Sequence, residues 1–278
     1  MNDNHDKIAI GLDLGTTSSG IGVYNNGKVE IIPNGKDEPT THSTVIIKDS
    51  DILIGEDTTD FLVKTFDTCI YEFKRLIGIK FDKELIQKDM ETLPFKIIRK
   101  DKNIPLIEIK NNGMPVLYNF IEIASIAIKK MIHMAEHYIL KKINELVISV
   151  PANFNESQRV LTKQAAELAG LRVIRIINEP TAAALAYYYN ETLENNKNIL
   201  VLDFGGGFFE VCIISLKKNE KEADFKEFEV LGISAKLGGK DFDNKLVDYF
   251  LNELNKDSIK ISNVFKNLKS IVKLLKNV

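Results

Sequence analysis

The chain has 278 residues, of which 44% are hydrophobic and 27% are charged, and its formal net charge at pH 7 is −2. This is enough apolar material for two domains or for one large lobed domain. Because the chain carries no basic excess and no apolar run of membrane-spanning length, we expect neither nucleic acid nor a membrane as a partner.

The two cysteines and the N-terminal residues suggest a compartment. Cys69 and Cys212 both lie in apolar stretches, which is typical of reduced, structural thiols rather than of a disulfide framework. Residues 1–7 are polar and show no secretory apolar segment. We therefore expect a cytoplasmic protein.

The first feature along the chain is a strand that turns through glycine. Residues 10–19 read IGLDLGTTSS, an apolar strand that reaches Asp13 and turns at Gly15. Glycine allows backbone N–H groups to converge on an anion, and an aspartate beside such a turn can hold the hydrated magnesium that accompanies a polyphosphate. By itself, the pattern is also that of an ordinary hairpin turn. Residues 20–33 then alternate around an Asn-Asn-Gly signal and predict an antiparallel hairpin.

The next stretch predicts a small appended subdomain at about residues 43–117, because it contains several short β-like runs in a mixed sequence. Lys74 stands there among apolar neighbours in the segment YEFKRLIG, residues 71–78. A lysine in this setting is either functional or a surface lysine whose stem lies along apolar side chains.

A long amphipathic helix is predicted over residues 119–141. His133 and His137 lie one turn apart on it, a spacing that could ligate a metal. No third ligand with a suitable spacing accompanies them, so we expect both histidines to face solvent.

A strand, a helix and a second strand follow, the unit of a sheet with parallel strands. The strands are predicted at residues 145–151 and 171–177, and the helix between them runs from the capping box at residue 155 to the glycine at residue 170. Glu179 then sits at a strand end beside Pro180, which is placed to begin a helix. Its carboxylate either interacts with the helix dipole or orders magnesium and water.

A second glycine turn repeats the pattern of the first. Residues 199–210 read ILVLDFGGGFFE, again an apolar strand that reaches an aspartate, Asp203, and then a run of glycines. If Asp13 and Asp203 point into one cleft, the two turns would clamp one nucleotide from both sides.

The remainder of the chain predicts a charged hairpin, a helix to residue 255 and a lysine-rich helix from residue 262. A Walker-type phosphate loop is excluded at Lys240, because Asp241 follows it where Ser or Thr would be needed.

Five segments together resemble the 70-kilodalton heat-shock chaperones, specifically the N-terminal nucleotide-binding domain of that family. They are GLDLGTT at 11–17, KRLIG at 74–78, VPANFNESQR at 150–159, RIINEPTAAA at 175–184 and LGGKDFD at 237–243. The resemblance implies an α/β fold of the bilobal, actin-like ATPase (ribonuclease H-like) class. A sugar kinase of the same superfamily is a distant alternative, which these segments disfavour.

The resemblance also implies an activity and a site. It implies ATP or ADP bound between two lobes with Mg²⁺, K⁺ being a further candidate ion, and slow hydrolysis that controls a separate peptide-binding domain. The implied catalytic residues are Lys74, Glu179, Asp203 and Asp13, and the last three would hold the metal through water. The implied cofactor-binding residues are Gly15, Thr16, Thr17, Ser18, Gly205, Gly206, Gly207, Gly238, Gly239 and Lys276.

By the same resemblance, residues 1–190 form the first lobe and residues 191–278 part of a second lobe. The resemblance runs to the last residue, so we expect a truncated form with an incomplete second lobe and no substrate-binding domain. Implied partners are J-domain cochaperones and nucleotide-exchange factors, with unfolded client proteins only in a full-length form. The implied roles are protein folding and the stress response.

Two departures from the family pattern lie in the second turn. Phe208 stands where the family has a threonine, so it has no hydroxyl for the γ-phosphate or water, and Glu210 stands where the family has an aspartate. Two hypotheses follow: an ATPase module of a chaperone, or a catalytically impaired nucleotide- or partner-binding module without turnover.

Overall fold

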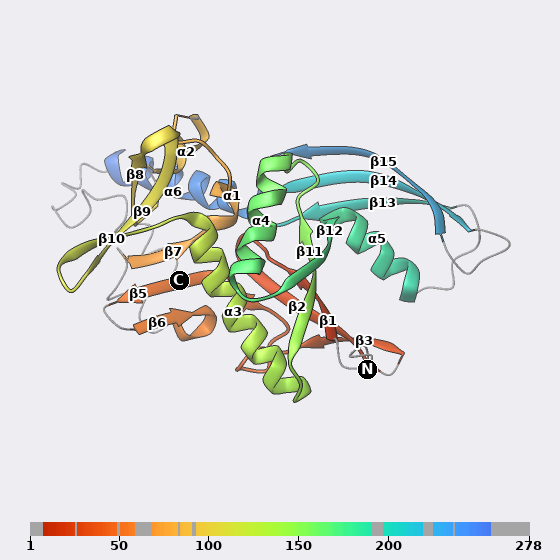
Figure 1. Ribbon diagram of the computed structural model, residues 1–278. Helices are drawn as coiled ribbons and strands as arrows, with labels where there is room; N and C mark the ends of the chain where they lie inside the picture. The colour runs from red at the N-terminus through yellow and green to blue at the C-terminus, as the bar shows by residue number, and fades with distance from the viewer. Residues whose placement is uncertain are drawn as a thin grey trace.

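The computed structural model describes residues 8–25, 27–48, 51–58, 68–82, 84–90, 93–190, 197–218, 225–235 and 237–256. Within these ranges the strands form one six-stranded sheet and three sheets of three strands (Figure 1). The predicted helix from residue 262 and Lys276 lie outside the described residues. No described helix is both long enough and apolar enough to span a membrane.

The six-stranded sheet has the order β12-β11-β1-β2-β3, with β4 paired to β2. Its parallel pairs are β1 with β11 and β11 with β12, while β2 runs antiparallel to β1, β3 and β4. The bounds are β1 Ile8–Asp13, β2 Ser18–Asn25, β3 Lys28–Ile32, β4 Thr41–His42, β11 Ile143–Val150 and β12 Arg172–Asn178. The predicted opening hairpin and the predicted strand–helix–strand unit are therefore confirmed.

The alternation along β1 gives this sheet its two faces. Ile10 and Leu12 are buried in the main core, whereas Gly11 and Asp13 are exposed on the opposite side. Two helices, α3 (Phe120–Ile139) and α4 (Glu156–Leu168), pack on each other and on β11 and β12 (Figure 1). The face of β1 that carries Gly11 and Asp13 is thus available for a site.

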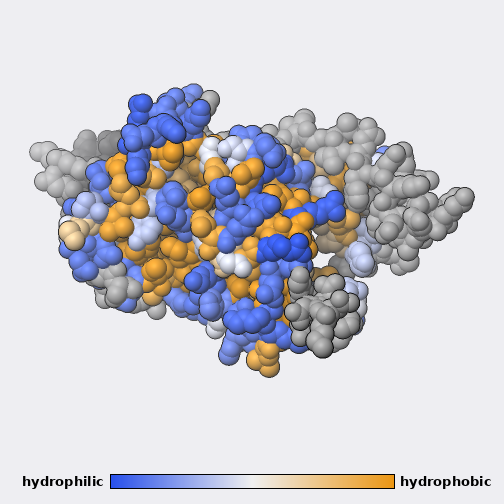
Figure 2. Space-filling view, in the orientation of Figure 1, coloured by the Kyte–Doolittle hydropathy of each residue, from blue (hydrophilic) through white to orange (hydrophobic). Residues whose placement is uncertain are grey.

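Capping boxes fix the starts of these two helices. The side chains of Asn119 and Glu122 bond each other's backbone N–H groups at α3, and those of Asn155 and Gln158 do so at α4. The predicted start of α4 is thereby confirmed. His133 and His137 are both exposed on α3, as expected. Figure 2 shows mixed hydrophilic and hydrophobic side chains over this side of the molecule.

Two small sheets with short helices follow the first hairpin. One sheet has the order β6-β5-β7, and the other has the order β10-β9-β8 (Figure 1). Their bounds are β5 Thr44–Lys48, β6 Asp51–Ile54, η1 Gly55–Thr58, β7 Cys69–Tyr71, α1 Phe73–Leu76, α2 Glu84–Met90, β8 Lys96–Lys100, η3 Asp101–Asn103, β9 Ile104–Asn111 and β10 Met114–Tyr118. Cys69 on β7 is buried and forms no disulfide within the described part of the chain.

The last sheet is an antiparallel meander, β13-β14-β15, followed by α6. Helix α5 packs on one face of it, where Ala184 joins Cys212 and Ile214 in a small buried cluster. Cys212 is also a free thiol, as expected. The bounds are α5 Glu179–Asn190, β13 Lys197–Phe204, β14 Phe209–Lys218, β15 Phe225–Ala235 and α6 Gly239–Lys256.

The other face of this meander exposes apolar side chains: Leu200, Leu202, Phe204 and Ile213 are 42–63% exposed. Such a face favours association with other apolar surfaces. The division of the chain into lobes at residue 190, and the subdomain at about 43–117, stay predictions.

Candidate functional site

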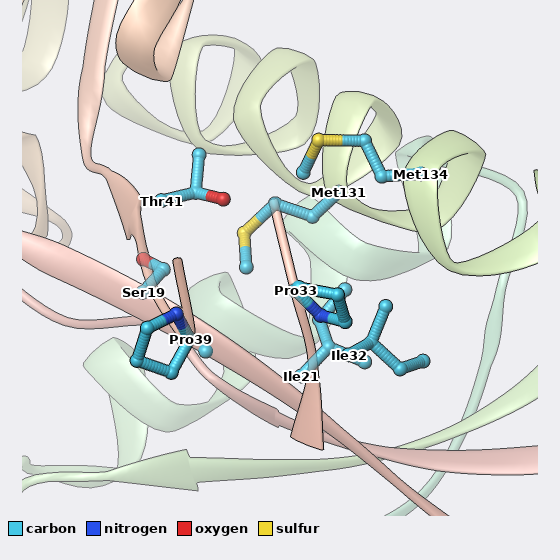
Figure 3. A pocket seen from close by; sticks show the side chains of 9 residues that line it. Ser19, Ile21, Ile32, Pro33, Pro39, Thr41, Met131 and Met134 are labelled. Carbon is cyan, nitrogen blue, oxygen red and sulfur yellow. The ribbon is translucent and has the colours of Figure 1, made fainter. Parts of the chain in front are cut away.

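The two predicted glycine turns meet at one cleft with a volume of about 1060 Å³. Asp13, Lys74, Glu179 and Asp203 all line it, as do the glycines of both turns. A second cavity, between α3 and the β2–β3 hairpin, has a volume of only about 10 Å³ and is closed by Met131 and Met134 (Figure 3). That space holds no more than a water molecule, so the large cleft is the candidate site.

The first turn is held in shape by its own hydroxyl groups. The Gly15 N–H donates to Ser19 Oγ at 3.1 Å, and Ser19 Oγ lies 2.8 Å from Ser43 Oγ. A Cβ atom on Gly15 would lie 1.9 Å from the carbonyl oxygen of Ser18, so only glycine fits there. Thr16, Thr17 and Ser18 follow and line the cleft.

The second turn touches the first directly. A Cβ atom on Gly206 would lie 2.0 Å from Thr17 Oγ1, and one on Gly207 would lie 2.6 Å from Thr16 Oγ1. The Gly205 N–H donates to the carbonyl oxygen of Phe208 at 3.0 Å and closes the turn. The structure thus brings together two turns that are about 190 residues apart, as the sequence predicts.

Gly238 and Gly239 lie against the second turn rather than among the residues that line the cleft. The Gly239 N–H donates to the carbonyl oxygen of Gly205 at 3.1 Å, and a Cβ atom on Gly238 would lie 2.4 Å from the carbonyl oxygen of Gly206. Their described contacts support the turn. A direct contact of either residue with nucleotide stays a prediction.

Asp13 projects from the end of β1 into the cleft. Ser149 lies opposite it in the register of β1 and β11, and the Ser149 hydroxyl donates to Asp13 Oδ1 at 2.9 Å. This hydrogen bond fixes the orientation of the carboxylate and leaves its second oxygen available for a ligand.

Lys74 and Glu179 form an ion pair on the wall of the cleft. Lys74 Nζ lies 2.5 Å from Glu179 Oε1, and the side chains are only 4% and 14% exposed. Burial raises the pKa of Glu179 to about 7, with Asp13 and Glu210 acting in the same direction, although Lys74 opposes the shift. Lys74 is therefore a buried residue of the site and not a surface lysine.

Asp203 is half-buried at the end of β13. Burial raises its pKa, and the neighbouring negative charge of Asp13 acts in the same direction. Asp13 and Asp203 both line the same cleft. Because hard oxygen ligands in such a space suit a hydrated Mg²⁺ ion, the donor set fits the expected metal.

Comparison with known proteins identifies the family. A sequence model described as Hsp70 protein matches residues 9–278. This chain belongs to the Hsp70 family. It therefore has the α/β, actin-like ATPase fold of the Hsp70 nucleotide-binding domain.

Curated Hsp70 relatives support this assignment. The chain is 41% identical over 248 residues to "Heat shock 70 kDa protein 2" of Paracoccidioides lutzii, covering 89% of this chain and 37% of the relative. It is 38% identical over 252 residues to "Heat shock 70 kDa protein" of Trichophyton rubrum, covering 91% and 38%. The chain thus spans less than two fifths of the length of these relatives.

The structure adds three residues to the site expected from the sequence of this Hsp70-family chain. Ser149 is one of them, and a single hydroxyl in the apolar strand ELVISVP is the signal for it. Glu210, which in the sequence is only a departure from the family pattern, has its carboxylate in the same group as those of Glu179 and Asp203. Phe208 is the third.

Phe208 has a structural role in this Hsp70-family chain. Its buried ring packs edge-on against Phe154, with ring centroids 5.9 Å apart, and against Val150 at the end of β11. The ring therefore joins the second turn to the segment after β11. Nothing in the chain alone indicates this contact, because Phe208 is far in sequence from both Val150 and Phe154.

Proposed function

We propose that this chain is an ATP-binding and slowly ATP-hydrolysing module of an Hsp70-type chaperone. One observation carries the proposal: two glycine turns touch across a single cleft that also contains Lys74, Asp13, Asp203 and Glu179. Membership of the Hsp70 family supports nucleotide as the ligand. A triphosphate needs this combination of converging backbone N–H groups, carboxylates for a metal and one cation.

The turns bind phosphate because their backbone can approach it closely. Glycine at positions 15, 206 and 207 leaves no Cβ atoms at the point where the two turns meet. The hydroxyls of Thr16, Thr17 and Ser18 add donors beside these N–H groups. A phosphate chain in the cleft would thus be held from both turns.

Magnesium accompanies such a phosphate chain and neutralises the charge that develops during transfer. Asp13, Asp203 and Glu179 would hold it through its water molecules. We propose Mg²⁺ for this role, with K⁺ as a further ion. Ser149 contributes by holding Asp13 in place.

Lys74 positions the attacking water and offsets negative charge on the transferring phosphoryl group. Its ammonium has three donors, of which the contact with Glu179 Oε1 uses one. Glu179 fixes the direction of the lysine side chain, because both groups are nearly buried and neither can turn to solvent. Positioning and electrostatic stabilisation are the main contributions a protein makes to phosphoryl transfer.

A second candidate function is a nucleotide- or partner-binding module without turnover. Phe208 favours it, because its ring packs against Phe154 and supplies no hydroxyl to the cleft. The two functions share the binding site and differ only in hydrolysis.

Single-turnover hydrolysis separates the two candidates. Purified protein is mixed with a trace of labelled ATP, and its rate is compared with that of Lys74→Ala. The ATPase function predicts a loss of about 100-fold or more in the variant. Equal rates would reject it, whereas nucleotide binding measured in parallel would still support the binding module. Phe208→Thr, which restores the hydroxyl, should raise the rate only if this side chain limits turnover.

The wider context is also proposed from the family. We propose a cytoplasmic role in protein folding and the stress response, with J-domain cochaperones and nucleotide-exchange factors as partners. Unfolded client proteins would be bound only where a substrate-binding domain is joined to this one. Family membership and the names of the curated relatives support the chaperone part of this proposal. Stimulation of single-turnover hydrolysis by a J-domain would test it.

A further inference from the structure

We infer that two ion pairs between the α1 segment and the start of α6 hold Lys74 in place against the second glycine turn. The pairs are Glu72 with Lys240 and Arg75 with Asp241, together the α1–α6 ion pairs. None of these four residues lines the cleft, so they act as positioning residues. The inference rests on the proposed ATPase function, in which Lys74 positions the attacking water.

Both pairs are largely shielded from solvent. Lys240 Nζ lies 2.5 Å from Glu72 Oε2, and these side chains are 10% and 14% exposed. Arg75 Nη1 lies 3.9 Å from Asp241 Oδ2, and the arginine side chain is 4% exposed. The second contact is too long for a hydrogen bond, but opposite charges at this depth still attract each other across that distance. Loss of one partner would leave an uncompensated buried charge, so the pairs keep the two segments together.

The α6 end of these pairs is bonded to the second glycine turn. The Gly239 N–H donates to the carbonyl oxygen of Gly205 at 3.1 Å, and the Lys240 N–H donates to the carbonyl oxygen of Gly206 at 3.0 Å. Both hydrogen bonds use main-chain atoms, so a change of the Lys240 side chain leaves them in place. The turn and the start of α6 therefore form one unit that keeps its shape without the ion pairs.

The α1 end of the pairs carries Lys74 on a single helical turn. The Arg75 N–H donates to the carbonyl oxygen of Glu72 at 3.1 Å, so residues 72–75 are joined locally. Glu72 has a φ of 57°, in the left-handed region that a residue with a Cβ atom rarely adopts. Such a backbone persists where the surrounding structure holds it, and Lys240 contacts the side chain of this residue. A shift of Glu72 would thus move Lys74 with it.

Arg75 also packs on the second turn itself. A Cβ atom on Gly207 would lie 3.0 Å from Arg75 Cδ and 2.6 Å from Thr16 Oγ1. The arginine stem and the two glycine turns therefore meet at one glycine. Because Lys74 is the residue before Arg75, this contact and the α1–α6 ion pairs set its place relative to a bound phosphate chain. A displacement of about 1 Å at such a site can cost about 100-fold in rate.

Single-turnover hydrolysis and nucleotide binding, measured on the same proteins, test the inference. Lys240→Met should slow hydrolysis about tenfold or more but change the dissociation constant of ATP by less than about threefold, because the main-chain bonds of the turn remain. Lys240→Arg keeps the charge, so its rate should stay within about threefold of wild type. Lys163→Met, which breaks a half-exposed pair on α4, is the matched control and should leave the rate unchanged.

Exchange of the two charges tests the pair itself and remains decisive if Lys240→Met fails to fold. Glu72→Lys and Lys240→Glu each place like charges together and should each slow hydrolysis about tenfold or more. The double variant restores opposite charges and should regain at least about fivefold of that loss. No recovery in the double variant, or ATP binding that weakens as much as hydrolysis slows in Lys240→Met, would overturn the inference.

Amide hydrogen exchange without nucleotide separates this inference from the proposed function. The N–H groups of Arg75 and Ile79 are hydrogen-bonded at the two ends of the α1 segment. In Lys240→Met both should exchange about tenfold faster or more, while the amides of α4 keep their wild-type rates. Unchanged exchange of Arg75 and Ile79 would overturn the inference even if wild type hydrolyses ATP. If wild type does not hydrolyse ATP, the ATPase function fails, whereas faster exchange confined to this segment would still support its attachment through the ion pairs.

Discussion

The buried pair of Lys74 and Glu179 allows a stability prediction with an internal comparison. Replacing Lys74 by Met removes the cation that contacts Glu179 Oε1 and leaves the carboxylate 14% exposed beside other negative charges. Removing one partner of a buried ion pair costs about 3–5 kcal/mol in the free energy of unfolding. For a chain of this size we expect the melting temperature to fall by about 5–9 °C.

The matched control is the pair of Lys96 and Glu108 on β8 and β9. These groups are also close, at 2.6 Å, but the lysine side chain is 65% exposed. Lys96→Met should therefore cost less than about 1 kcal/mol, because solvent screens the pair. Distance alone would predict equal effects for the two pairs, whereas burial predicts a difference of at least about 2 kcal/mol.

Urea unfolding followed by circular dichroism measures both effects, and a double variant completes the cycle. Glu179→Gln in the Lys74→Met background removes the unpaired charge and should recover about 2 kcal/mol. Equal destabilisation by Lys74→Met and Lys96→Met, or no recovery in the double variant, would refute the reasoning.

The raised pKa of Glu179 also predicts how the effect of Lys74→Met changes with pH. The pKa of Glu179 rises from its ordinary value of 4.5 to about 7 in the folded protein, so protonation of this group favours the folded state. The stability that this carboxyl contributes is full below pH 4.5 and is lost as the pH rises through about 7. Lys74→Met should therefore be more destabilising at pH 8.5 than at pH 6. Greater destabilisation at pH 6 than at pH 8.5 would contradict this prediction.

Three further predictions concern other parts of the molecule. Gly206→Ala should lower the free energy of unfolding in urea by about 1–3 kcal/mol, because the new Cβ atom would lie 2.0 Å from a hydroxyl of the facing turn. Gly35→Ala is the control: no atom lies within 4 Å of its Cβ position, so it should lower the free energy of unfolding by less than about 0.5 kcal/mol. Cys69 and Cys212 are buried, and burial raises the pKa of the Cys212 thiol. Both thiols should therefore react slowly with a thiol reagent at pH 8 until urea is added. Fast reaction of the native protein would contradict this prediction. Leu200→Lys, at a side chain 60% exposed, should lower self-association in sedimentation with little change in stability, and unchanged association would show that this face is not involved.

The sequence by itself determined the local structure and the family. Apolar strands, the capping boxes at Asn119 and Asn155, and the two glycine turns depend on neighbouring residues, so they can be inferred from short segments. The same turns located Asp13 and Asp203, and the specific segments around them were enough for the resemblance to the Hsp70 family that the comparisons confirmed.

Only the tertiary structure decided how these segments act on one another. The contact between Gly206 and Thr17, the burial of Lys74 against Glu179, and the anchoring of Glu210 by the Ala152 N–H all join residues that are far apart in the chain. Burial and distance set the pKa of a carboxylate and the cost of an unpaired oxygen, and neither quantity is encoded by nearby residues. For that reason only the fold shows that Glu210, a mere departure from the family pattern in the sequence, lies beside Glu179 and Asp203.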